Sequence, residues 1–354
     1  MSRYKIIGAP WNIPGAKNVE DCVTSEEVMI KAKLNYTVDK CELVAKMPFK
    51  EENADAILDE VNEGKAFLNG TNVFRNCPNT YATYRTDVNI PLGNVKSKYE
   101  VVQNSSAFNF FDGAIGKDKA IWQTAGYFGN GERIFVSAKL PDNITVKGDK
   151  IENYLVFANS HDGTSGVNIL FTPIRVICQN TLNAAIRNAE SFIRFRHTAS
   201  VNSKLLSAAE ILGISQQKAI VAEQMFNAMA DVKFDDKSTM EYIASIYLTD
   251  AEFERVKSID EKSGINRLFT RSGQLIQDAQ ISTRKVNMLY DTFNYYIDGP
   301  GQAEFRGTAY GAYNAITGYY SNIANLQGDK RLDSLLYGNA AKVTQNAVEA
   351  LFEY

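Results

Sequence analysis

Hydrophobic positions in the first 95 residues come in short runs that are separated by turns. In "TSEEVMIKA" the spacing of Thr24 and Glu27 is that of a capping box, which predicts a short helix. "NADAILDEVNEG" predicts a second short helix that ends at Gly64. "LNYTVDKCELVAKMPF" alternates loosely and predicts a pair of strands. Residues 69–94 are rich in Asn, Thr, Gly and Pro, which predicts loop and edge strand.

The middle of the chain is rich in strand-like runs. "WQTAGYFGNGERIFVSAKL" contains two such runs joined by "GNG", which predicts a hairpin. "NYLVFANS" predicts a third strand, and "GVNILFTPIRVICQ" is apolar at successive positions, as in a strand that is covered on both faces. "NTLNAAIRNAESFIRF" has helical spacing, with Asn180 or Thr181 as a suitable N-cap.

From about residue 205 the hydrophobic spacing is helical, and Thr249 with Glu252 has the spacing of a second capping box. Residues 205–232 and 265–297 have apolar side chains at i, i+3 and i+4, and an aromatic-rich helix is expected over 308–326. The whole pattern predicts an α+β fold, with an antiparallel or mixed β-sheet core, packed helices and a largely helical C-terminal region. We expect three parts: a mixed α/β segment (1–95), a β-rich core (96–200) and a helical region (201–354).

Composition and charge narrow the class of protein. Of the 354 residues 45% are hydrophobic and 22% are charged, which is typical of a soluble globular protein. The four cysteines are far apart in the chain and have neither zinc nor disulfide-framework spacing. No signal peptide or membrane span is evident, so we expect a cytoplasmic protein. The net charge is −3, but residues 96–200 carry 12 basic and 9 acidic side chains and are therefore basic.

Motifs for catalysis and cofactor binding are largely missing. The closeness of His161, Asp162 and Cys178 invites a catalytic interpretation, but "HDGTSG" is a turn sequence and Cys178 lies in an apolar strand. We therefore interpret His161 as architectural, and we expect no cofactor and no metal. A carboxylate magnesium site stays open as a weaker alternative to turn formation. Its candidate ligands are Asp112, Asp142, Asp149 and Asp162.

Basic and aromatic residues in the strand-rich middle favour nucleic-acid binding. In "ERIFVSAKL" the alternation places Ile134 and Val136 on one face and Arg133, Phe135 and Lys139 on the other. Such a face suits a single strand, because cations neutralise phosphates while bases stack on aromatic rings. A solvated outer face without a ligand is the alternative. The predicted nucleic-acid-binding residues are Arg133, Phe135, Lys139, Arg175, Arg187, Arg194 and Arg196.

Four blocks of sequence carry a family resemblance. They are "YEVVQNSSAFNFFDGAIG", "WQTAGYFGNGERIFVSAKLP", "NYLVFANSHDGTSGVNILFTPIRVICQNTLNAAI" and "GTAYGAYNAITGYYSN". They resemble phage/plasmid-related proteins that are grouped as a domain of unknown function. The resemblance implies a mobile-element origin and action in the bacterial host cytoplasm, but no defined activity. The matching motif positions are Gly131, Arg133, His161, Asp162, Gly163, Pro173, Arg175, Cys178, Asn180 and Leu182.

The order of elements is similar, at fold level only, to the core of Rad-type and Red-beta-type single-strand annealing proteins. We therefore expect a non-enzymatic phage or plasmid protein that forms homo-oligomers and binds single-stranded DNA, annealing complementary strands in replication or recombination. One alternative is a virion structural or host-interaction (anti-defence) protein with a phage or host protein as its partner. A second is a metal-dependent, nuclease-like enzyme.

Overall fold

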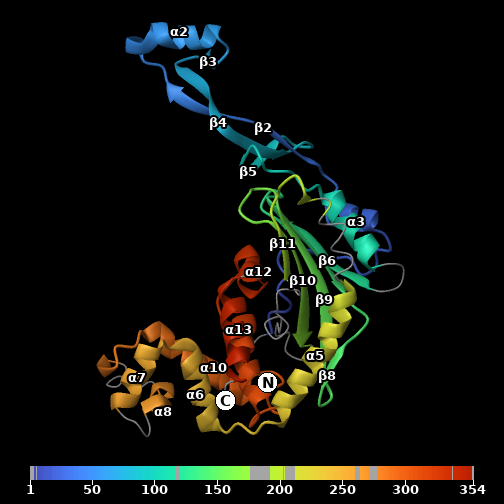
Figure 1. The fold of residues 1–354 in the computed structure, drawn as a ribbon, viewed down its shortest axis with the longest axis vertical. Helices are drawn as coiled ribbons and strands as arrows, with labels where there is room; N and C mark the ends of the chain where they lie inside the picture. The colour runs from blue at the N-terminus through green and yellow to red at the C-terminus, as the bar shows by residue number, and fades with distance from the viewer. Residues whose placement is uncertain are drawn as a thin grey trace.

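The computed structural model describes residues 4, 6–115, 120–175, 192–201, 203, 212–259, 264–270, 277–336 and 338–352. In Figure 1 these residues form a body at one end of the long axis and a slender arm at the other. The α+β class predicted from the sequence is confirmed, with antiparallel sheets followed by a largely helical C-terminal region.

The body is built on a seven-stranded antiparallel sheet with the order β1-β6-β7-β9-β10-β11, and β8 pairs with β9 outside this path. Its strands are β1 (Lys17–Asn18), β6 (Ile121–Phe128), β7 (Arg133–Lys139), β8 (Ile144–Val146), β9 (Asp149–Ser160), β10 (Val167–Arg175) and β11 (Phe192–Phe195). The predicted hairpin is β6–β7, and the predicted two-sided strand is β10, in which every residue is buried.

Different parts of the chain cover the two faces of this sheet. Helices α1 (Ser25–Lys31) and α3 (Asn104–Ile115) pack on the face that carries Ile134 and Val136. The opposite face, which carries Phe135, is covered by the N-terminal segment through Trp11 and by a late helix through Leu332. Burial of apolar side chains on both faces is the main source of stability for such a sheet.

The arm is a four-stranded antiparallel sheet with one helix at its tip. It consists of β2 (Val38–Pro48), a 3-10 turn (Glu51–Asn53), α2 (Ala54–Asn62), β3 (Ala66–Asn69), β4 (Asn72–Arg85) and β5 (Ile90–Lys96). The long β4 pairs with each of the other three strands. A small cluster around Ile57, Ala66 and Val73 holds α2 on the sheet. Polar contacts join the base of the arm to the body: Thr83 Oγ1 donates to the His161 carbonyl at 2.6 Å, and Arg85 Nη1 donates to the Asn130 carbonyl at 2.9 Å.

The C-terminal region packs on the β8 end of the sheet. Its helices are α5 (Leu212–Asp231), α6 (Asp236–Tyr247), α7 (Asp250–Ile259), α8 (Gly264–Phe269), α10 (Thr283–Asp298), α11 (Ala309–Gly318), the π-helical η4 (Tyr319–Ile323), α12 (Gly328–Leu336) and α13 (Asn339–Ala350). Tyr310, Tyr313 and Tyr320 are buried in the core that these helices share with Phe171 of β10. These three tyrosines therefore serve packing.

Local signals for helix ends are confirmed. Thr24 and Glu27 form a reciprocal capping box at the start of α1. Thr249 and Glu252 exchange hydrogen bonds in the same way before α7. None of the described helices is both long and apolar enough to cross a membrane.

Three predicted elements were wrong. The residues 192–195, expected at the end of a helix, form strand β11, which pairs with β10 over Val167–Leu170. The expected pair of strands over residues 34–49 is one strand, β2. Residues 69–94, expected as loop and edge strand, contain the central strand β4 of the arm. The polar composition of β4 misled the prediction because only three of its 14 residues are buried and the others are half-buried or exposed, where polar strand residues are stable.

Candidate functional site

A basic groove with a volume of about 810 Å³ lies where the base of the arm meets the body. Three short segments line it: residues 94–99 at the end of β5 and just after it, the turn 163–166 between β9 and β10, and residues 194–198 at the end of β11. Four of the lining residues are cationic, and all four are exposed: Lys96, Lys98, Arg194 and Arg196. The lining residues include no Asp or Glu.

Glycines allow the three walls to approach closely. A Cβ atom on Gly93 of β5 would lie 2.5 Å from the Cα of Asp162, and one on Gly166 would lie 2.2 Å from the Phe195 carbonyl oxygen. Both distances are shorter than any real Cβ contact, so any side chain at either position would push a wall outward. Gly163, in the turn itself, has φ +76°, as expected for the turn glycine predicted there.

A stacked aromatic pair forms the floor of the groove. The rings of Tyr99 and His197 are 4.5 Å apart at an interplanar angle of 17°. Tyr99 donates its hydroxyl to the Ser160 carbonyl at 2.8 Å. His197 Nδ1 lies 2.9 Å from the Glu100 carbonyl and must donate to it, because a carbonyl oxygen only accepts. Burial lowers the pKa of His197, and the Glu100 carbonyl partly opposes this shift.

The groove cations lack acidic partners. Within the described ranges Lys96, Lys98, Arg194 and Arg196 make no salt bridge; Lys96 Nζ donates to the Thr80 hydroxyl at 3.0 Å. A cleft lined by charges of one sign focuses the electric field, so these four cations give a local positive potential. A groove of this kind attracts phosphate or another anion.

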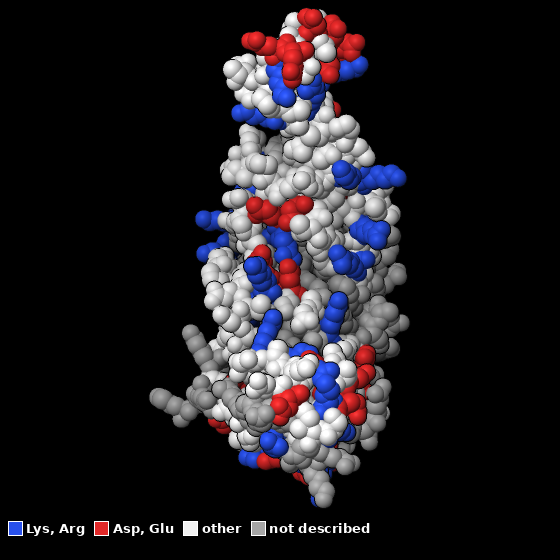
Figure 2. Space-filling model, turned by 90° about the vertical axis from the view of Figure 1, so that its left-hand side faces the viewer, with Lys and Arg blue, Asp and Glu red and all other residues white. Residues whose placement is uncertain are grey.

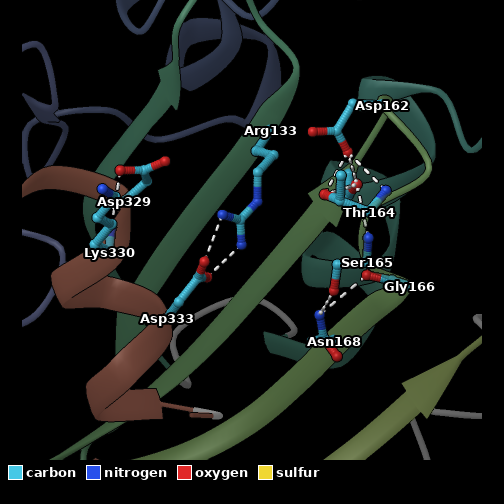
Figure 3. Close-up of polar contacts among 10 residues, drawn as sticks. Arg133, Asp162, Thr164, Ser165, Gly166, Asn168, Asp329, Lys330 and Asp333 are labelled. Carbon is cyan, nitrogen blue, oxygen red and sulfur yellow. Dashed lines mark hydrogen bonds and ion pairs between the residues drawn. The ribbon is translucent and has the colours of Figure 1, made fainter. Parts of the chain in front are cut away.

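The turn beside the groove is fixed by its own polar side chains. Asp162 Oδ1 accepts from the backbone N–H of Thr164 at 2.9 Å and from its hydroxyl at 2.6 Å, and the Ser160 hydroxyl donates to the same oxygen. Asn168 Nδ2 donates to the Ser165 hydroxyl at 3.1 Å and to the Gly166 carbonyl at 3.0 Å. Figure 3 shows these contacts on one side of the turn. Asp162 therefore shapes the turn, which is the structural role expected of it.

His161 is fully buried next to this turn. Its Nε2 lies 2.9 Å from Asn104 Oδ1, and Asn104 Nδ2 donates to the Leu34 carbonyl, so Nε2 carries the proton. Its Nδ1 has no hydrogen-bond partner in the described part of the chain. Burial lowers the pKa of His161 to about 3, helped by the nearby His197. A buried neutral histidine of this kind fits the architectural interpretation.

The strand face that carries Arg133, Phe135 and Lys139 is not open, which corrects the expected binding face. Phe135 is 0% exposed beneath α12 and the N-terminal segment. Arg133 makes a two-point ion pair with Asp333 of α12, with Nη1 to Oδ2 at 2.6 Å, as Figure 3 shows. Lys139 pairs with Glu152. The ion pair of Arg133 therefore holds α12 on the sheet, and the ion pair of Lys139 joins β7 to β9.

Arg175 lies at the opposite end of β10 from the groove. Asn168, seven residues before it, pairs with Arg194, so the two arginines are about 23 Å apart along the strand direction. Arg175 is 0% exposed, forms an ion pair with Asp149 and donates to the Gly301 carbonyl at 2.7 Å. Its buried guanidinium is a structural group in this conformation.

The structure thus brings two predicted residues, Arg194 and Arg196, into one groove, and it separates the others from them. Arg187, Cys178 and Asn180 lie outside the described residues. Sequence reasoning missed Lys96, Lys98, Tyr99 and His197. A signal was present, since "KSKYE" and "RFRHT" each combine basic and aromatic residues, but only the fold places them side by side.

The four aspartates weighed as metal ligands are not gathered. Asp149 and Asp162 lie at opposite ends of β9, while Asp112 on α3 accepts a hydrogen bond from Ser25. Over the residues that the structure describes, no three His, Cys, Asp or Glu side chains are grouped as a metal site would require. Gly131, the remaining predicted turn position, has φ +112° and faces the Tyr36 hydroxyl.

Comparison with known proteins gives one match. The family model described as a domain of unknown function, DUF932, matches residues 91–347. The chain belongs to this family. The DUF932 match begins in β5 and ends in α13, so it includes the groove and leaves most of the arm outside. The predicted membership in a family of unknown function is confirmed at this level. No curated protein matches the chain, and no solved structure does.

Proposed function

We propose that this chain binds single-stranded nucleic acid, with its phosphates held in the basic groove at the base of the arm. The observation that carries the proposal is the convergence of four exposed cations, without an acidic lining residue, on a groove of about 810 Å³. Arg and Lys neutralise phosphates and release counterions, and this effect supplies most of the affinity for a strand without regard to its sequence.

The other lining groups suit a polynucleotide better than a small anion. Ser165 places a hydroxyl on one wall, and Tyr99 offers a partly exposed ring that is already held flat against His197. A single strand has unpaired bases that stack on such rings, whereas a duplex keeps its bases inside. The groove thus combines phosphate neutralisation with a surface for base contact.

The family resemblance supplies the context of the proposal. Since the sequence resembles phage/plasmid-related proteins, we propose that the strand is DNA of a mobile element in the cytoplasm of a bacterial host. We propose annealing of complementary strands as the form of this activity, because the order of elements predicted from the sequence is similar to that of single-strand annealing proteins. This role requires no catalytic reaction at the groove.

Fluorescence anisotropy with a labelled single-stranded oligonucleotide tests the proposal. We expect Arg194→Glu/Arg196→Glu to reduce affinity at least tenfold, because two attractive phosphate contacts become repulsive. Lys237→Glu/Lys342→Glu is the matched control, since it reverses two exposed cations on α6 and α13 and leaves the groove intact. Absence of binding by the unmodified chain at low salt, or an equal loss in both variants, contradicts the proposal.

A second candidate role is that of a virion or host-interaction protein of a bacteriophage. The projecting arm supports it, because the arm exposes large apolar side chains such as Leu58 and Phe67. Exposed apolar residues at the end of a projection commonly mark contact with another protein. Mass spectrometry of purified virions separates the two roles: a stoichiometric copy number in virions favours this one, and absence from virions favours nucleic-acid binding in the cell.

A further inference from the structure

The tip of the arm carries an acidic helix face with an apolar residue at its centre. Asp55, Leu58 and Asp59 follow the i, i+3, i+4 spacing of one helix face on α2, and all three are exposed. Leu58 leaves 48% of its surface open, although Ile57 beside it is buried in the arm. Asp55 and Asp59 make no salt bridge in the ranges that the structure describes.

The charge of the tip is opposite to that of the groove. Residues 50–65 contain six acidic and two basic side chains, a net charge of −4. The groove at the other end of the arm has four cationic side chains and no acidic lining residue. In Figure 2 acidic side chains gather at the top of the molecule, over the arm tip.

The tip cannot reach its own groove in this conformation. In Figure 1 α2 and β5 lie at opposite ends of the arm, and β4 runs between them as one continuous strand of 14 residues. One chain cannot bring its acidic tip to its own basic groove, but the tip of one chain can reach the groove of another.

We propose that α2 of one copy docks in or against the basic groove of a second copy. Asp55 and Asp59 then face Arg194 and Arg196 of the neighbour, and Leu58 gains cover that the isolated chain does not give it. The two surfaces differ, so the contact is head-to-tail. After two copies join, one still has a free tip and the other a free groove. Further copies can therefore add until the assembly closes into a ring or extends as a filament. This inference goes beyond nucleic-acid binding, although both use the groove.

Sharing of the groove has a direct consequence. Acidic side chains and phosphates compete for the same cations, so an oligonucleotide should dissociate the tip from the groove at low ionic strength. Tip variants, by contrast, should keep the affinity for a single strand. Failure of the docking proposal can therefore be told apart from failure of the proposed function.

A charge swap followed by sedimentation velocity at low salt tests the docking. The tip variant is Asp55→Lys/Asp59→Lys and the groove variant is Arg194→Glu/Arg196→Glu. Each should be monomeric alone, because like charges then meet at the contact, and self-association should weaken at least tenfold relative to the unmodified chain. Mixing the two variants, or combining all four changes in one chain, should restore the assembly. Circular dichroism checks that each variant is folded.

Lys237→Glu/Lys342→Glu should assemble like the unmodified chain. A monomeric unmodified chain at low salt and at its highest soluble concentration overturns the proposal. So does unchanged assembly in the tip variant, or failure of the folded, mixed variants to associate.

Discussion

The rings of Tyr99 and His197 stack with their centroids 4.5 Å apart, although one follows β5 of the arm and the other follows β11 of the body. Two backbone contacts reinforce the pair, because Glu100 N–H donates to the His197 carbonyl at 3.1 Å and His197 Nδ1 donates to the Glu100 carbonyl. The groove is therefore not a gap between loosely placed loops. Its position is fixed by an aromatic stack and by hydrogen bonds on both sides.

Removal of the Tyr99 ring should weaken both the fold and binding of a strand. Tyr99→Ala deletes a partly buried ring and its stack, and we expect a loss of about 2 kcal/mol or more in the free energy of unfolding, with weaker oligonucleotide binding. Tyr99→Phe keeps the stack and loses the hydrogen bond to the Ser160 carbonyl, at a cost of about 1 kcal/mol. Urea unfolding and anisotropy measure the two effects. Binding by Tyr99→Phe that is as weak as that of Tyr99→Ala would count against the stacking role.

Stability should fall with pH below about 6.5 because of His161. Its folded-state pKa of about 3 lies below the usual value of 6.5, so unfolding takes up a proton in this range. The contribution of neutral His161 to the free energy of unfolding is complete above pH 6.5 and is lost as the pH falls toward 3. Between pH 7 and pH 5 this histidine alone should remove about 2 kcal/mol.

Replacement of His161 by glutamine isolates this effect. Glutamine can still donate to Asn104 and does not titrate, so His161→Gln should lose about 2 kcal/mol less than the unmodified chain when urea unfolding is repeated at pH 5. An identical pH dependence in the two proteins would show that His161 is not held neutral.

Arg175 and Asp149 should behave as a buried structural pair. Removal of one partner leaves an uncompensated buried charge, so Arg175→Met or Asp149→Leu alone should cost about 3–5 kcal/mol. The double variant should be more stable than the sum of the single changes implies, because no charge is then left unpaired. Thermal or urea unfolding of the four proteins in this cycle gives the coupling. Additive losses would mean that the two groups act independently.

Much of the fold follows from local pattern, and the site does not. The capping boxes at Thr24 and Thr249, the β6–β7 hairpin and the two-sided strand β10 all depend on residues that are close together in the chain, so their signals can be read from short windows. Strand β11 was taken for the end of a helix because Ile193 and Phe195 fit either periodicity in so short a run. Only its pairing with β10, a segment outside this short run, shows that these residues form a strand.

What covers the predicted binding face of β7 could not be predicted for a related reason. The alternation in β7 correctly separates Ile134 from Phe135, but it cannot say what covers each face. The cover over Phe135 comes from α12, and the ion pair of Arg133 with Asp333 joins positions 200 residues apart. Arg194 and Arg196, which the sequence predicts as nucleic-acid-binding residues, line the groove, and Lys96 and Lys98 join them there only through the placement of the arm.

Because Lys139 is paired on the sheet and Lys98 lines the groove, we expect their alanine variants to differ in oligonucleotide affinity. Lys139→Ala should leave the oligonucleotide affinity within about twofold of that of the unmodified chain, because Lys139 pairs with Glu152 on the sheet and contributes no phosphate contact. Lys98→Ala should weaken binding severalfold. A larger effect of Lys139→Ala than of Lys98→Ala in anisotropy would move the binding surface back to the strand face.

The salt dependence of oligonucleotide binding tests the central claim most directly. With four phosphate contacts in the groove, the slope of log K against log salt concentration should be about −3 for a single strand, since each contact contributes about −0.7. Arg194→Ala/Arg196→Ala should halve that slope to about −1.4. Equal slopes for the two proteins, or no binding by the unmodified chain at low salt, would contradict the assignment of the groove as a site for single-stranded nucleic acid.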